Sequence, residues 1–177
     1  MVLSSGSLPV LLSVLHQHSL PPATKAKALY AISAVVRSYR PALEALEAED
    51  GVAGVVHLLN DADADSVMKR KAATFVTDIV TDRPSFADKL VKLGVCEGIL
   101  PLLQSNETAV QEKAMEALET LIGAAPSTAR LLNTLEAKKS LAELRARTDE
   151  AAKADPELVE HIFRHLDVLH GMLTNNP

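Results

Sequence analysis

The stretch KALYAISAVVR, residues 27–37, decides how this chain folds, because its pattern occurs three times. Its apolar residues recur at the three- and four-residue spacing of a helix with one buried face. The same opening, Lys-Ala followed by apolar residues, returns as KAATFV at 71–76 and as KAMEAL at 113–118. The copies begin 44 and 42 residues apart, which indicates an internal repeat.

Two further landmarks keep the same period of 42 to 45 residues. A glycine opens an apolar segment in GSLPVLLSVL (6–15), GVAGVVHLL (51–59) and GVCEGILPLL (94–103). A proline precedes a shorter segment at Pro41, Pro84 and Pro126. Armadillo and HEAT units have periods of about 40–47 residues and are helical. We therefore predict an all-α chain, a right-handed α-solenoid of armadillo/HEAT-like repeats with about three repeats and a C-terminal capping helical segment.

The predicted organisation is a single solenoid domain over residues 1–177. Its repeats cover about 5–48, 49–92 and 93–137, and the C-terminal cap covers about 138–173. The cap has an apolar stripe of Leu158, Ile162, Leu166 and Leu169 and an otherwise polar surface, as a terminal repeat requires. Because the chain opens inside a unit, we expect that it is a fragment lacking one or more upstream repeats.

Local signals place the helix boundaries within each unit. Glycine is expected where the backbone is left-handed or crowded. Thr24 is expected to cap the long helix of the first unit, and Asp65 or Ser66 that of the second. The prolines are expected to break the chain before the third, shorter helix of each unit.

Composition narrows the class of protein. The chain has 177 residues with 47% hydrophobic and 3% aromatic content, which suits a closely packed helical core. The formal net charge of −5 argues against a general nucleic-acid binder, which needs a basic face. A single cysteine excludes an internal disulfide and favours a reducing compartment. No apolar run is long enough to span a membrane. We expect a monomer that binds neither nucleic acid nor membrane.

No arrangement of residues predicts catalysis, a cofactor or a metal. Cys96 begins an apolar helix and is interpreted as a core thiol. His161 and His165 have the i, i+4 spacing that can hold a metal, with Glu157 and Glu160 nearby, but are interpreted as a solvated face of the last helix. The DADAD stretch at 61–65 lacks the glycine and closing glutamate of a calcium loop. We therefore expect a protein that is not an enzyme.

Helical spacing divides the long helix of each unit into two faces. In the first unit the inward face is formed by Ala28, Leu29, Ile32, Val35 and Val36. The opposite faces of the three stacked helices form a row of small and polar residues, which we call the ladder. The ladder consists of Lys27, Tyr30, Ala34 and Arg37, then Lys71, Thr74, Asp78 and Thr81, then Lys113, Glu116 and Thr120. In solenoids such a row lines the concave groove, which is the usual binding surface.

The sequence also resembles a known family. The stretches ATKAKALYAISAVVRSYRPALEAL (23–46), GVAGVVHLL (51–59) and KRKAATFVTDIV (69–80) are similar to the armadillo-type nucleotide-exchange factors of the 70-kDa heat-shock chaperones. This is the heat-shock-protein-binding protein 1 family with its fungal and plant relatives. The resemblance covers roughly residues 5–170, and KALYAIS followed by Val-Arg is its most specific part.

The resemblance implies a function without catalytic residues. Members of the family hold one lobe of the chaperone ATPase domain on the concave face, which favours an open nucleotide cleft and speeds ADP release. Carried over by position, the contacts would include Tyr30, Ala34, Arg37, Thr74, Asp78, Thr81, Glu116 and Thr120. Arg37 and Asp78 would make charged hydrogen bonds across that interface. The resemblance implies a cytoplasmic protein, and the alternative is the endoplasmic reticulum lumen if an upstream signal is missing.

Three alternatives remain open at this point. A generic armadillo adaptor would grip an extended peptide with a ladder of Asn residues, often with Trp. Here the equivalent positions hold Ala34, Asp78 and Thr120, and the chain has no Trp, which counts against that mode. A metal-dependent hydrolase built on the last helix would need stoichiometric metal, and a purely structural scaffold subunit would need none of these features.

Overall fold

Helices account for every regular element in the described part of the chain. The computed structural model describes residues 7–17, 19–48, 51–133 and 135–175. The expected boundary at Gly6 lies outside them. The elements follow in the order α1 (Ser7–His16), α2 (Pro22–Ser38), α3 (Arg40–Ala48), α4 (Gly51–Asn60), α5 (Ser66–Asp82), α6 (Phe86–Lys92), α7 (Val95–Ile99), the 3-10 helix η2 (Leu100–Gln104), α8 (Thr108–Ala124), α9 (Ser127–Leu132), α10 (Leu135–Ala152) and α11 (Pro156–Asn175).

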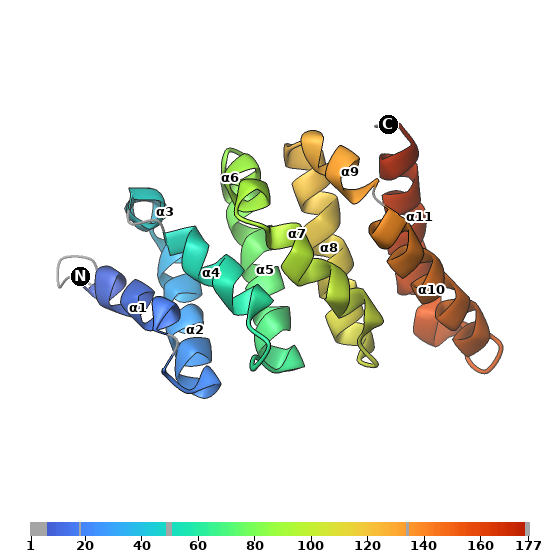
Figure 1. Cartoon of the computed structure of the whole chain (residues 1–177), viewed down its shortest axis with the longest axis horizontal. Helices are drawn as coiled ribbons and strands as arrows, with labels where there is room; N and C mark the ends of the chain where they lie inside the picture. The colour runs from blue at the N-terminus through green and yellow to red at the C-terminus, as the bar shows by residue number, and fades with distance from the viewer. Residues whose placement is uncertain (1–6, 18, 49–50, 134, 176–177) are drawn as a thin grey trace.

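The helices stack into two layers along one axis (Figure 1). One layer contains α1, α4, α7 with η2, and α10, each in contact with the next. The other layer contains α2, α5, α8 and α11, again in sequence order. The short helices α3, α6 and α9 lie along one edge, each between a long helix and the next element of the first layer (Figure 1). This arrangement confirms the predicted all-α solenoid.

The core lies between the two layers and contains mainly aliphatic side chains. Four of the five residues assigned to the inward face of the first long helix, Ala28, Leu29, Ile32 and Val36, are no more than 4% exposed. Val35 is partly buried and packs against the same cluster. The inward face read from helical spacing is therefore confirmed, because a helix in a stacked layer must bury its apolar stripe.

The glycines at the starts of two units have different roles, one in a left-handed backbone and one at a crowded position. Gly94 has φ 88, the left-handed conformation that side chains disfavour, and it directly precedes α7. Gly51 has no unusual conformation, but a Cβ there would lie 2.5 Å from Cδ1 of Leu46. One glycine therefore serves the backbone turn, whereas the other allows close packing of consecutive units.

The predicted caps are partly right. Asp65 caps α5, because its side chain accepts a hydrogen bond of 2.7 Å from the backbone N–H of Met68. The expectation for Thr24 is wrong, since α2 begins at Pro22 and Thr24 lies within its first turn. A proline at the first helical position supplies a suitable φ and leaves one fewer free N–H to cap.

Polar side chains connect consecutive units at recurring places. Lys25 forms an ion pair of 3.1 Å with Asp61, and its side chain is only 2% exposed. The Asn60 side chain at the end of α4 donates to the carbonyl of Gly94, and the Gln104 side chain at the end of η2 donates to that of Ser140. The two amide bonds therefore run from the end of one helix to the backbone of the next unit.

The C-terminal helices extend the solenoid. α10 packs beside η2 and α11 packs beside α8, so each continues one layer. Arg147 of α10 donates to the carbonyl of Leu103 at 2.7 Å, and Arg145 pairs with Asp167 of α11 at 2.6 Å. Within the predicted stripe, Ile162, Leu166 and Leu169 are buried, whereas the Leu158 side chain lies outside the described part. The terminal segment thus uses the same packing as a repeat.

Candidate protein-binding surface

The ladder residues lie on α2, α5 and α8, the second layer, and all of them are accessible. Tyr30 is 68% exposed although it is a large aromatic side chain. All the described ladder residues of α2 are exposed, those of α5 are partly exposed and partly half-buried, and those of α8 are half-buried. The exposed ones are Lys27, Ala34, Arg37, Lys71 and Thr81, and the half-buried ones are Thr74, Asp78, Lys113, Glu116 and Thr120. Their accessibility agrees with the facing expected from the sequence, whereas their role in binding stays a prediction.

A groove between α2 and α5 brings many of these residues together. Its lining includes Tyr30 and Arg37 from α2, Thr74 and Asp78 from α5, and Lys113 from α8. A second hollow beside it reaches Lys27 and Lys71. Residues more than 80 positions apart in the chain therefore border one surface, because the long helices lie side by side.

Arg37 and Asp78 form an ion pair with each other, with 3.5 Å between their charged atoms. The sequence suggested that each would bond to a partner protein, but the neighbouring helix already supplies a counter-charge. Burial raises the pKa of the Asp78 carboxyl, and the Arg37 guanidinium acts in the opposite direction. A binding partner would therefore meet these two side chains as a unit.

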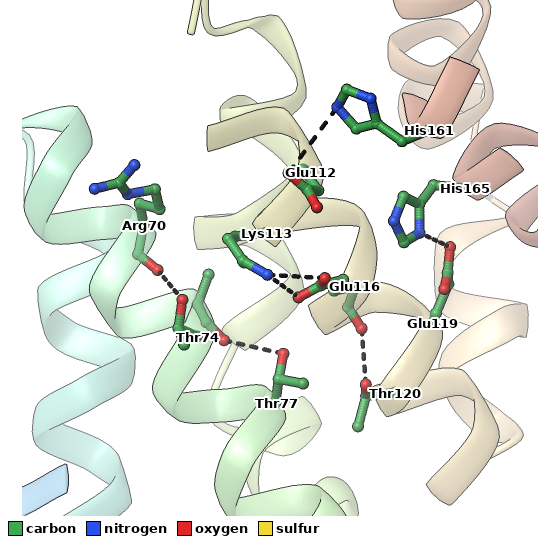
Figure 2. A network of polar contacts seen from close by, with 11 residues as sticks. Arg70, Thr74, Thr77, Glu112, Lys113, Glu116, Glu119, Thr120, His161 and His165 are labelled. Atoms are coloured by element: carbon green, nitrogen blue, oxygen red, sulfur yellow. Dashed lines mark hydrogen bonds and ion pairs between the residues drawn. The ribbon is translucent and has the colours of Figure 1, made fainter. Parts of the chain in front are cut away.

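Hydroxyl groups on this surface bond to their own helices. Thr74 Oγ1 donates to the carbonyl of Arg70 at 3.0 Å, and Thr120 Oγ1 donates to that of Glu116 at 2.8 Å (Figure 2). Such bonds to the preceding turn are common for threonine in helices. The single proton of each hydroxyl is therefore already used within its own helix.

The sequence reasoning missed one basic residue of the surface. Arg70 lines the groove between α2 and α5, although it was not assigned to the ladder. The signal was its position four residues before Thr74, since residues at that spacing share a helix face.

The interpretation of His161 and His165 as a solvated face is wrong for His165, whereas His161 is 37% exposed. His165 Nδ1 lies 2.8 Å from Oε1 of Glu119, and both side chains are 19% exposed. His161 Nε2 lies 4.0 Å from Oε2 of Glu112 (Figure 2). The histidines thus face α8 rather than Glu157 and Glu160 on their own helix, which only the packing of α11 on α8 could reveal.

The remaining candidate residues are placed more simply. Cys96 is buried, as expected of a core thiol, and burial raises its pKa to about 12. A thiol with that pKa is protonated at neutral pH and is a poor nucleophile. Across the described helices, none combines the length and the apolar character that a bilayer crossing requires.

Comparison with known proteins identifies the fold. No family model matches the chain, and no curated protein sequence matches it significantly. An engineered protein of solved structure superposes with a TM-score of 0.62 at 20% identity, over 99% of this chain and 82% of that one. A designed armadillo repeat protein in complex with the peptide (KR)4 gives 0.60 at 17% identity, over 97% and 84%. Another designed armadillo repeat protein gives 0.56 at 19% identity, over 96% and 83%.

The chain therefore has an armadillo-like helical repeat fold. At these identities the similarity bears on the fold alone. The resemblance to the exchange factors of the 70-kDa chaperones therefore remains a prediction.

Proposed function

We propose that this protein binds the ATPase domain of a 70-kDa heat-shock chaperone through the ladder and promotes release of ADP. The observation that carries the proposal is the placement of the stretch with the most specific resemblance. Its Tyr30, Ala34 and Arg37 are exposed on α2, beside Thr74 and Asp78 of α5. A surface spread over neighbouring repeats in this way suits a protein partner better than a small ligand.

The charges of the ladder suggest the kind of surface that it meets. The ladder contains four basic residues, Lys27, Arg37, Lys71 and Lys113, and two acidic ones, Asp78 and Glu116. It is therefore positive, although the chain as a whole carries −5. Complementary potentials steer association, so the corresponding patch of the chaperone should be acidic.

Exchange by this route requires no catalytic residue. The ladder must bind the chaperone better when its nucleotide cleft is open than when it is closed, because a ligand with equal affinity for both states shifts nothing. A preference of about 1.4 kcal/mol changes the population ratio tenfold. Release of ADP then becomes faster because the open state is more populated. As part of this proposal we place the protein in the cytoplasm, acting as a monomer.

The test is release of a fluorescent ADP analogue from a purified chaperone ATPase domain, with increasing amounts of this protein. We expect release to become faster and to saturate. Tyr30→Ala should weaken the effect, because it removes the most exposed aromatic side chain of the ladder. Tyr39→Ala is the matched control, since Tyr39 is 50% exposed but lies at the C-terminal end of α2, outside the ladder.

Two results would count against the proposal. If the chain neither accelerates release nor binds the ATPase domain, the protein is an armadillo adaptor or scaffold with another partner. If Tyr30→Ala and Tyr39→Ala weaken the effect equally, the ladder is not the contact surface. Circular dichroism of both variants must match the wild type, so that a loss of activity reports binding.

A further inference from the structure

Four side chains with metal-binding chemistry meet between α8 and α11. Glu112 and Glu116 are four residues apart on α8, and His161 and His165 are four residues apart on α11, so each pair shares a helix face. Potential ligand atoms of Glu112, Glu116 and His165 lie within 4.8 Å of one another. His161 lies outside this group of three, but its Nε2 is 4.0 Å from Glu112 Oε2, at the edge of the group. Figure 2 shows the two histidines facing the acidic residues across the interface.

A fifth residue orients one of the histidines. The ring nitrogen Nδ1 of His165 lies 2.8 Å from Oε1 of Glu119, and both groups are largely buried. A carboxylate at Nδ1 holds the proton there and leaves Nε2 unprotonated as a ligand atom. In Figure 2 this second ring nitrogen points away from Glu119, toward the side of Glu116. Metal-binding histidines commonly have such a carboxylate behind them.

We propose that His161, His165, Glu112 and Glu116 bind one Zn²⁺ ion, with Glu119 positioning His165. Two imidazoles and two carboxylates suit Zn²⁺, whereas Mg²⁺ and Ca²⁺ prefer oxygen ligands alone. With bonds of about 2.0–2.1 Å in tetrahedral geometry, ligand atoms lie about 3.4 Å apart. The 4.0 Å between His161 Nε2 and Glu112 Oε2 exceeds this by about 0.6 Å, and the 4.8 Å limit for Glu112, Glu116 and His165 exceeds it by up to about 1.4 Å. Side-chain rotation must bring His161 into the group, and it has room to do so because His161 and Glu112 are 37% and 32% exposed.

The ion would change two features of the molecule. It would join α11 to α8 by bonds from both helices and so fasten the C-terminal pair to the rest of the solenoid. It would also displace Lys113, whose Nζ lies 2.7 and 2.8 Å from the two carboxylate oxygens of Glu116. Lys113 belongs to the ladder, so metal binding would free its ammonium group at the candidate surface. Neither effect depends on the proposed chaperone partner.

The test measures binding of Zn²⁺ to the full chain, purified without a histidine tag, by calorimetry and thermal unfolding. We expect one ion per chain and a rise in Tm on addition of Zn²⁺. The double variant His161→Ala/His165→Ala should lose the rise and bind at least a hundredfold more weakly. The matched control is His16→Ala/His170→Ala, which changes two exposed histidines elsewhere and should keep both properties. No rise in Tm in the wild type, or an equal rise in the ligand double variant, would overturn the proposal.

Two single variants distinguish a loss of metal binding from a loss of folding. Glu112→Gln keeps the shape of the side chain but removes a charged ligand, so we expect about tenfold weaker binding with unchanged helicity in the presence of a chelator. Lys113→Met removes the group that competes for Glu116, so we expect tighter binding. If Lys113→Met binds Zn²⁺ more weakly, or Glu112→Gln binds it as tightly as the wild type, these residues do not form the site.

Discussion

At the scale of single residues, the pair of Lys25 and Asp61 has the clearest energetic consequence. The Lys25 ammonium is nearly inaccessible to water, and Asp61 is its partner at 3.1 Å, whereas the Asp61 side chain is 17% exposed. Asp61 also accepts a hydrogen bond from the backbone N–H of Asp63. Removal of Asp61 therefore leaves the buried Lys25 ammonium without a counter-charge, whereas removal of Lys25 leaves no buried charge unpaired.

We expect Asp61→Ala to lower the free energy of unfolding by about 3 kcal/mol, since it strands a buried ammonium group. Lys25→Met should cost less than about 1 kcal/mol, because the apolar stem remains and Asp61 reaches water. The double variant should recover most of the loss. Urea denaturation of the three variants measures this, and equal costs for the two single variants would contradict the described burial of Lys25.

The same pair makes stability depend on pH. The hydrogen bond from Lys25 lowers the pKa of Asp61 in the folded chain below its ordinary value. The stabilising contribution is therefore fully present above an unfolded-state pKa of about 3.9 and is lost as the pH falls through the lower folded-state pKa. We expect the stability difference between the wild type and Asp61→Asn to shrink as the pH is lowered below about 4.

The comparison with Asp61→Asn is needed because other carboxyls act in the opposite direction. Burial raises the pKa of Asp78 and of Glu119. Stability linked to these groups is present below the unfolded-state pKa and declines as the pH rises through the folded-state pKa. Urea titrations of both proteins from pH 6 downward separate the contributions, and a difference that is constant below pH 4 would refute the role of Asp61.

At the scale of elements, a glycine allows α4 and α7 to pack closely. A Cβ on Gly98 would lie 2.7 Å from Cβ of Leu59 and 3.1 Å from its backbone carbon. Gly123, near the end of α8, has no atom within 4 Å of such a Cβ apart from its own chain neighbours and helix backbone. The same substitution should therefore have opposite effects at the two positions.

We expect Gly98→Ala to destabilise the chain by about 2 kcal/mol through overpacking against α4. Gly123→Ala should stabilise it by about 0.5 kcal/mol, because alanine has the higher helix propensity and space is available. Thermal unfolding of both variants tests the pair. Equal shifts in Tm would mean that the interface of α4 and α7 adapts to a methyl group.

Element boundaries show where sequence reasoning succeeds and where it fails. The period of the landmarks and the apolar spacing predicted the long helices and the buried positions Leu29 and Ile32. The spacing works because burial of one helix face is a local pattern. The cap of α2 was misassigned, because the helix begins at Pro22 and Thr24 lies within its first turn. The preference for proline at the first helical position is a local signal that the assignment of Thr24 left out.

At the scale of the whole molecule, charge is unevenly distributed. The chain carries −5, whereas the ladder has more basic than acidic residues. Steering by such a surface acts on the rate of association and is screened by salt over about 10 Å at 0.1 M. The ladder should therefore determine how fast the proposed chaperone complex forms, more than how long it lasts.

We expect Arg37→Glu to slow association with the chaperone ATPase domain, and to do so more at low salt than at high salt. Arg130→Glu is the charge-matched control, because Arg130 is exposed on α9 outside the ladder. Stopped-flow association at several salt concentrations distinguishes them. If the two variants give the same rates, overall charge and not the ladder sets association.

The sequence alone determined the all-α solenoid, the inward face of the long helices and the outward position of the ladder. These features follow from periodicity, which each segment carries by itself. Only the tertiary structure decided which distant residues meet: Arg37 with Asp78, Lys25 with Asp61, and the histidines of α11 with the glutamates of α8. The physical reason is that helical periodicity predicts which side chains are buried or exposed, whereas the register between stacked helices determines which side chains meet. That register depends on side-chain packing across the whole stack.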